Sequence, residues 1–130
     1  MSIATLNATS SFPSITVSDL TKSLHFYVDG LGFEVVERNE VEGVLRFAML
    51  KSGGSMVGLG QDDFAKGRDR VKGTGLRLWF MTKQDLPTLA TRAKAAGLKL
   101  DGDPAPLPWG PTAFGLVDPD GFAITICGER

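Results

Sequence analysis

Apolar residues recur at helical spacing in two segments of the chain. In the first segment, Ser18 or Asp19 can cap a helix whose apolar residues are Leu20, Leu24, Tyr27, Val28 and Leu31. In the second segment, which follows Asp85, the apolar residues are Leu86, Leu89, Ala90, Ala93 and Ala96. Spacings of three and four place each set on one face of a helix, and Gly32 and Gly97 are typical C-terminal stops. The pattern predicts two amphipathic helices.

Most of the remaining segments are typical of short β-strands, because they alternate apolar and polar residues or form brief apolar runs. The predicted strands cover residues 14–18, 33–38, 45–50, 55–60, 76–80, 99–101, 112–117 and 122–127. Ser52-Gly53-Gly54-Ser55 and Pro119-Asp120-Gly121 are typical of hairpin turns, since glycine adopts the positive φ that tight turns need.

The two halves of the chain repeat one order of elements: a strand, a helix and three strands. The helix stops Gly32 and Gly97 lie 65 residues apart, and the turn glycines Gly54 and Gly121 lie 67 apart. We therefore predict an α+β fold in which two βαβββ repeats form a curved mixed sheet, an open half-barrel with both helices on its convex side. One domain would span residues 1–130, with repeat one at about 13–61, a linker at about 62–73 and repeat two at about 74–128.

Two motifs resemble the signatures of a known superfamily. Residues 15–20 (ITVSDL), followed by Ser23, Phe26-Tyr27 and Leu31-Gly32-Phe33, resemble the opening signature of the glyoxalase, bleomycin-resistance and extradiol-dioxygenase superfamily, whose fold is called the vicinal oxygen chelate fold. Residues 118–121 (DPDG), followed by an apolar strand, resemble its closing signature. The resemblance covers about residues 12–128 and implies this fold. It implies less about activity, because function depends on the residues of the site.

Enzymes of this superfamily commonly chelate one divalent metal through His or Glu side chains on the concave face. Counted from the matching motifs, the four ligand positions fall at Phe12, Gly58, about Arg77 and Thr125. None of the four is a good ligand for a divalent ion, which needs imidazole, thiolate or oxygen donors and is repelled by arginine. The one histidine of the chain, His25, lies on the first helix, where we interpret it as a structural side chain. We expect no metal and no other cofactor.

Composition and charge narrow the possible partners and location. The 130 residues include 14 basic and 15 acidic side chains, a net charge of -1 that favours neither nucleic acid nor an anionic membrane as a partner. We find no secretory signal and no apolar stretch long enough to span a membrane. The single cysteine, Cys127, cannot form an internal disulfide, and we interpret it as a small buried residue. These features predict a protein of the reducing cytoplasm.

Strand alternation predicts which side chains the concave face presents. If Leu76, Leu78 and Phe80 face the helices, the intervening Arg77, Trp79 and Met81 face the concavity. A tryptophan beside an arginine on an open sheet face suits a flat or anionic ligand. The predicted ligand-binding residues are Arg77, Trp79, Trp109, Met56, Gly58, Thr125 and Cys127.

Pro108-Trp109-Gly110 is similar to the bleomycin-resistance branch of the superfamily, whose members bind a drug without chemistry, carry no catalytic metal and typically form homodimers. The hypothesis is therefore a metal-free protein, without catalytic residues, that binds an aromatic or amphipathic drug or metabolite by sequestration or sensing. The near-neutral charge argues against bleomycin itself, which is cationic. The alternative is an enzyme of the same superfamily: a metal-dependent lyase, isomerase or dioxygenase, or a metal-free enzyme that uses Arg77 to stabilise an oxyanion. A dimeric interaction module without a ligand is a third possibility.

A homodimer is expected on physical grounds as well. The curved sheet leaves strand edges and an apolar face that one chain of 130 residues cannot cover, and a symmetric partner covers both. The amino-terminal arm, Met1 to Phe12, is apolar at Ile3, Leu6 and Phe12 and is expected to pack on the neighbouring subunit.

Overall fold

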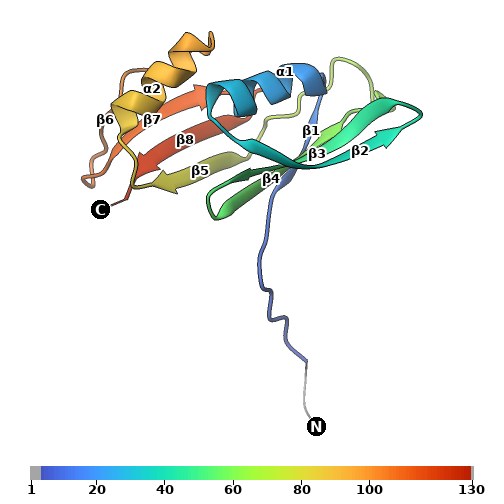
Figure 1. Cartoon of the computed structure of the whole chain (residues 1–130), viewed down its shortest axis with the longest axis horizontal. Helices are drawn as coiled ribbons and strands as arrows, with labels where there is room; N and C mark the ends of the chain where they lie inside the picture. Colours follow the sequence, from blue (N-terminus) through green and yellow to red (C-terminus); the bar gives the residue numbers. More distant parts are fainter. Residues whose placement is uncertain (1–3, 130) are drawn as a thin grey trace.

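The fold consists of two four-stranded sheets with the helices on one side of them, as a computed structural model of residues 4–129 shows (Figure 1). The first module contains β1 (Ser14–Val17), α1 (Leu20–Leu24), η1 (His25–Gly30), β2 (Glu34–Val41), β3 (Val44–Ser52) and β4 (Ser55–Gln61). The second contains β5 (Arg77–Thr82), α2 (Leu86–Ala95), β6 (Ala105–Pro106), β7 (Thr112–Val117) and β8 (Ala123–Gly128). The predicted order of elements is confirmed in both modules. No helix within residues 4–129 is long and apolar enough to cross a bilayer.

Each module builds its own mixed sheet. The strand orders are β1-β4-β3-β2 and β5-β8-β7-β6, so each module has one parallel pair, β1 with β4 and β5 with β8, and two antiparallel pairs. The predicted α+β class and open mixed sheet are confirmed. The backbone ladders nevertheless stay within each module, so side chains and loops hold the two modules together.

The first helix differs from the second by one residue. Thirteen positions separate the N-cap Asp19 from Gly32, whereas twelve separate the N-cap Asp85 from Gly97. The first helix accommodates the extra residue by widening into the π-helical turn η1, the single-turn form in which π-helix occurs within α-helices. Of the two candidates for the first N-cap, the structure uses Asp19, whose carboxylate accepts a hydrogen bond from the Lys22 amide.

One predicted strand is misplaced. Residues 99–101 form only an isolated bridge between Leu100 and Leu116, and the edge strand of the second sheet is instead β6. The segment between them contains Gly102 and Pro104, which break the strand pattern. Proline at position 106 is tolerated in β6 because an edge strand can leave one side of its backbone without ladder hydrogen bonds.

The core lies between the helices and the facing side of both sheets. Val57 and Leu59 of β4 and Ile124 of β8 are fully buried there. A chain of edge-to-face aromatic contacts runs through this layer, from Phe26 to Tyr27 to Phe33 to Phe80, with ring centroids 4.9, 5.8 and 5.3 Å apart. The last contact joins β5 to the first module, so apolar packing unites the two halves on the helix side.

Candidate functional site

Strand β5 presents two chemically different faces. Leu78 and Phe80 pack into the core, whereas Arg77, Trp79 and Met81 lie on the face turned away from the helices and are exposed, as strand alternation predicts. Leu76 is an exception to the expectation: it precedes β5 and stays exposed, so it adds nothing to the core.

Arg77 lies across the neighbouring strand β8. Its Nη1 donates a hydrogen bond to Thr125 Oγ1 over 3.0 Å. The parallel register places Trp79 beside Thr125 and Met81 beside Cys127. Thr125 and Cys127 are only 7% and 1% exposed although they share this open face, and Cys127 is a free thiol, as expected of a small buried residue. The bond to Thr125 uses one of the five guanidinium N–H groups of Arg77, and the other four have no hydrogen-bond partner among residues 4–129.

The two tryptophans form an exposed aromatic pair above this strand. Their ring centroids lie 6.5 Å apart at an interplanar angle of 41°. Trp109 comes from the loop before β7, which closes through hydrogen bonds from the Gly110 amide to the Leu107 carbonyl and from the Leu107 amide to the Pro111 carbonyl. Trp79 and Trp109 are 45% and 57% exposed, so both are accessible to a ligand or a partner.

Met56 and Gly58 belong to β4, in the other sheet, and no described contact links either of them to Arg77 or the tryptophans. The Phe47 ring from β3 lies directly over Gly58: a Cβ built at Gly58 would approach the Phe47 ring to 2.9 Å. Phe47 is a residue of this face that the sequence analysis missed. In the β3–β4 register Phe47 lies opposite Gly60, and its ring reaches diagonally over Gly58. The signal was this pair of glycines beside an aromatic residue, where the ring covers bare backbone.

The four positions that the sequence analysis matched to metal ligands do not suit a divalent cation. Arg77 places a positive charge there and is bonded to Thr125, the Phe47 ring takes the space beside Gly58, and Phe12 offers no lone pair. Within the described residues, no cluster of three or more His, Cys, Asp or Glu side chains could hold a metal ion. The guanidinium and the indole rings of this face suit hydrogen bonding and aromatic stacking instead.

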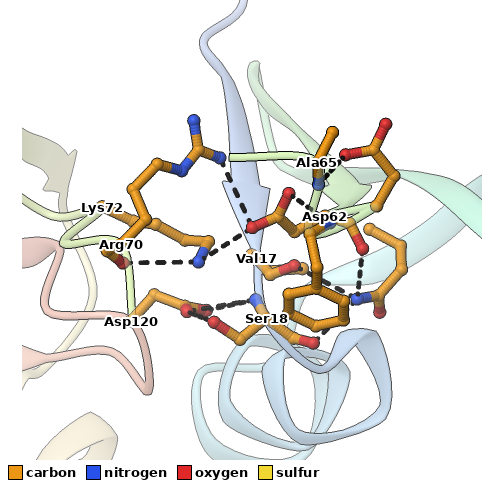
Figure 2. Close-up of polar contacts among 10 residues, drawn as sticks. Val17, Ser18, Asp62, Ala65, Arg70, Lys72 and Asp120 are labelled. Carbon is orange, nitrogen blue, oxygen red and sulfur yellow. Dashed lines mark hydrogen bonds and ion pairs between the residues drawn. The ribbon is translucent and has the colours of Figure 1, made fainter. Parts of the chain in front are cut away.

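The DPDG turn after β7 is hydrogen-bonded to the first module, a role beyond the turn geometry expected from sequence. The Ser18 amide and hydroxyl both donate to Asp120 Oδ1, over 3.0 and 2.6 Å (Figure 2). Tyr27 Oη donates to Asp118 Oδ2 over 2.8 Å, while Asp118 Oδ1 accepts from the amides of Asp120 and Phe122. Burial raises the pKa of the Asp118 carboxyl, and burial together with Asp118 raises that of the Tyr27 hydroxyl.

The segment between the modules is fastened at both ends. Asp62, directly after β4, pairs with Lys72 Nζ at 3.0 Å and with Arg70 Nη2 at 3.4 Å (Figure 2), and the Lys72 contact lowers the pKa of the Asp62 carboxyl. The Gly73 amide donates to the Asp120 carbonyl over 3.1 Å, and Gly73 packs directly on Gly121. Asp62 thus has a structural role, since it binds the two basic side chains at the far end of this segment.

His25 also has a structural position. Its Nδ1 lies 2.8 Å from Asp29 Oδ2, and its Nε2 lies 2.8 Å from the carbonyl oxygen of Ala96 at the end of α2. The carbonyl of Ala96, followed by the carboxylate of Asp29, raises the pKa of the His25 imidazole, because only the protonated ring donates to both acceptors.

Paired βαβββ modules with helices on one side and an open face on the other define the class of this domain. A family model described as "Glyoxalase/Bleomycin resistance protein/Dioxygenase superfamily" matches residues 5–126. The chain belongs to this superfamily. No curated protein matches the sequence.

Solved structures from several bacteria share the fold. A superfamily member from Sphaerobacter thermophilus is 30% identical over 95% of this chain and 98% of its own, with a TM-score of 0.73. TioX from Micromonospora sp. ML1 is 19% identical over 95% of this chain and 100% of its own, with a TM-score of 0.77. A protein from the mobile metagenome of V. pseudocholerae is 24% identical over 100% of this chain and 98% of its own, with a TM-score of 0.68. The last two similarities establish the fold alone.

Proposed function

We propose that this protein binds a small, flat aromatic molecule carrying an anionic group on the face formed by Arg77, Trp79 and Trp109, without a metal and without turnover. The observation that carries the proposal is the position of Arg77, which places a guanidinium with free N–H groups beside two exposed indoles, at a position that the motif alignment matches to a metal ligand of the superfamily. Such a guanidinium orients a carboxylate through two parallel hydrogen bonds, the orienting task that a metal ion performs in the enzymes of the superfamily.

The aromatic pair supports the same reading. Burial of apolar surface contributes about 25 cal/mol for each Å² removed from water, so a flat ligand that covers one indole gains a few kcal/mol before its ordering cost. The hydroxyl of Thr125 already accepts a hydrogen bond from Arg77, which leaves the other N–H groups of Arg77 to bind the ligand. This arrangement corresponds to the drug-binding, metal-free branch of the superfamily better than to its metalloenzymes.

Calorimetric titration with 2-naphthoate and its neutral counterpart 2-naphthol tests the proposal. Arg77→Leu should weaken naphthoate by about 1.5–3 kcal/mol, the range for hydrogen bonds to charged groups, and leave naphthol nearly unaffected. Trp79→Ala should weaken both compounds. Arg38→Leu, which removes an exposed arginine on β2, is the matched control and should change neither affinity. Unchanged binding in both Arg77→Leu and Trp79→Ala would refute the site, and turnover of a bound compound would favour the enzymatic alternative.

We further propose that two chains form a homodimer over this face and that the protein works in the reducing cytoplasm. Trp79, Met81, Trp109 and Val117 are about half exposed, an apolar surface that a second copy would cover, leaving the ligand between subunits. Residues 4–12 are exposed and run away from both sheets (Figure 1), which suits an arm that reaches a partner; Ile3 lies outside the described residues. Light scattering at micromolar concentration should give twice the mass of one chain, and a monomer mass would contradict the dimer.

A further inference from the structure

A cavity of about 190 Å³ lies between the two modules, on the helix side of the sheets. Arg77 and the two tryptophans do not line it, whereas Met81, at the far end of the Arg77 face, does. The β3–β4 turn lines this cavity. In Figure 1 that hairpin points towards β5 of the other module. Leu31 and Phe33 of the first module and Phe80, Leu89, Phe114 and Ile126 of the second form its apolar walls.

The rim of this cavity is polar and uncharged. Ser52 and Ser55 of the β3–β4 turn lie on one side, and Thr82 and Gln84 at the end of β5 lie on the other. The Thr82 hydroxyl contacts Gln84 Oε1 at 3.0 Å, which leaves the Gln84 amide nitrogen free of any partner in residues 4–129. None of the lining residues, all within the described part of the chain, carries a charge.

The cavity exists because the two modules place different residues at one structural position. Ser52 and Ser55 face each other across the first turn, where the second module has Asp118 and Phe122. Phe122 is buried and belongs to the core, whereas Ser55, on the same face of β4 as the buried Val57, is exposed. A serine in place of a phenylalanine leaves the volume of an aromatic ring unfilled.

We propose that this cavity is a second binding site, for a neutral single-ring aromatic molecule that bears one hydroxyl or amide group. An apolar protein cavity of about 150 Å³ takes up benzene, so a volume near 190 Å³ suits one ring with a short polar substituent. The ring contacts the three phenylalanines, and the substituent reaches the hydroxyl and amide groups of the rim. A carboxylate is disfavoured because the walls offer no cation to pair with it.

Methyl and indole NMR signals, followed during titration with benzyl alcohol, test the proposal with benzoate as the charged counterpart. Benzyl alcohol should shift the methyl signals of Leu31, Leu89 and Ile126, and it should do so equally in Trp79→Ala, whereas any stacking on the exposed indoles shifts the indole N–H signals of Trp79 and Trp109 and is lost in that variant. Benzoate should leave these methyl signals unchanged. Because the two sites report through different signals, failure here leaves the proposal for the Arg77 surface untouched.

Two filling variants and one control sharpen the test. Ser55→Phe installs the residue found at the matching position of the second module and should weaken benzyl alcohol about 10- to 100-fold, the loss of one buried ring. Leu89→Trp fills the same space from α2 and should act alike if Ser55→Phe folds poorly. Lys51→Phe adds the same ring to β3 beside the turn, opposite Met56 on the other face, and should keep wild-type affinity. No methyl shifts in the wild type, or wild-type affinity in both filling variants, would overturn the proposal.

Discussion

The turn between β3 and β4 and the turn between β7 and β8 occupy matching places in the two modules but meet the other module differently. The second turn is closed: Asp118 and Asp120 bond to Tyr27 and Ser18, and Phe122 fills the space beneath. The first turn has serines and glycines at the matching positions, and a cavity remains beneath it. The β7–β8 turn therefore joins the two modules by hydrogen bonds and packing, whereas the equivalent β3–β4 turn lines a cavity between them.

This difference shows that equivalent turns of the two repeats contribute differently to the contact between the modules. No backbone ladder joins the two sheets, and beside the shared apolar core the hydrogen bonds from Tyr27 to Asp118 and from Ser18 to Asp120 link the DPDG turn to the first module. We therefore expect substitutions at the two turns to have very different effects on stability.

The largest expected effect is at Asp118. Asp118→Ala leaves the Tyr27 hydroxyl and the amides of Asp120 and Phe122 without their buried acceptor, which should lower the free energy of unfolding by about 3–4 kcal/mol. The matched change in the open turn, Ser52→Ala, should stay within about 0.5 kcal/mol, as surface substitutions usually do. Urea unfolding of both variants measures the difference, and equal losses would show that the two junctions are not distinct.

A pair of glycine substitutions gives an intermediate effect. A Cβ at Gly73 would overlap the backbone of Gly121 and Phe122, where the segment between the modules crosses the closed turn. Gly73→Ala should therefore cost about 2 kcal/mol or more. Gly54 has open space around its Cβ position and no positive φ, so Gly54→Ala should be neutral or stabilise by up to about 1 kcal/mol. Thermal unfolding compares the two, and a tolerated Gly73→Ala would contradict the close crossing.

The smallest effect concerns pH and the contact between the helix ends. The folded-state pKa of His25 lies above its unfolded value, so its contribution to stability is complete below about pH 6.5 and is lost as the pH rises through the folded pKa. His25 is the one histidine of the chain, which makes the assignment simple. The urea midpoint should fall slightly between pH 5.5 and pH 8.5 in the wild type and stay nearly level in His25→Gln. An equal fall in both proteins would assign the pH dependence to other groups.

Local pattern was sufficient to predict most of the fold. Helical spacing and glycine stops located both helices, and alternation located seven of the eight strands, because these signals depend on neighbouring residues. The π-helical turn is visible in the sequence only as the extra residue between Asp19 and Gly32. The sixth strand was misplaced because two residues at a sheet edge carry almost no periodic signal.

The site was harder to predict than the fold because it depends on partners far apart in sequence. Alternation along β5 correctly separated Arg77 and Trp79 from the core, but the bond from Arg77 to Thr125 needs the β5–β8 register. The contact between Ser18 and Asp120 spans 102 positions and carries no local signal. The cavity was also missed, although aligning the two repeats would have set Ser55 against Phe122 and pointed to the unfilled volume.

The separation of the backbone ladders also has an evolutionary consequence. Because no ladder crosses between the sheets, the strand pairing of one repeat places no constraint on the strand sequences of the other, so the two repeats can diverge in their strands while keeping one architecture. The pairs Ser18 with Asp120 and Tyr27 with Asp118 are different, because each joins one half to the other. The two residues of each pair should therefore covary among related sequences: where one residue of a pair is substituted, its partner is expected to be substituted as well.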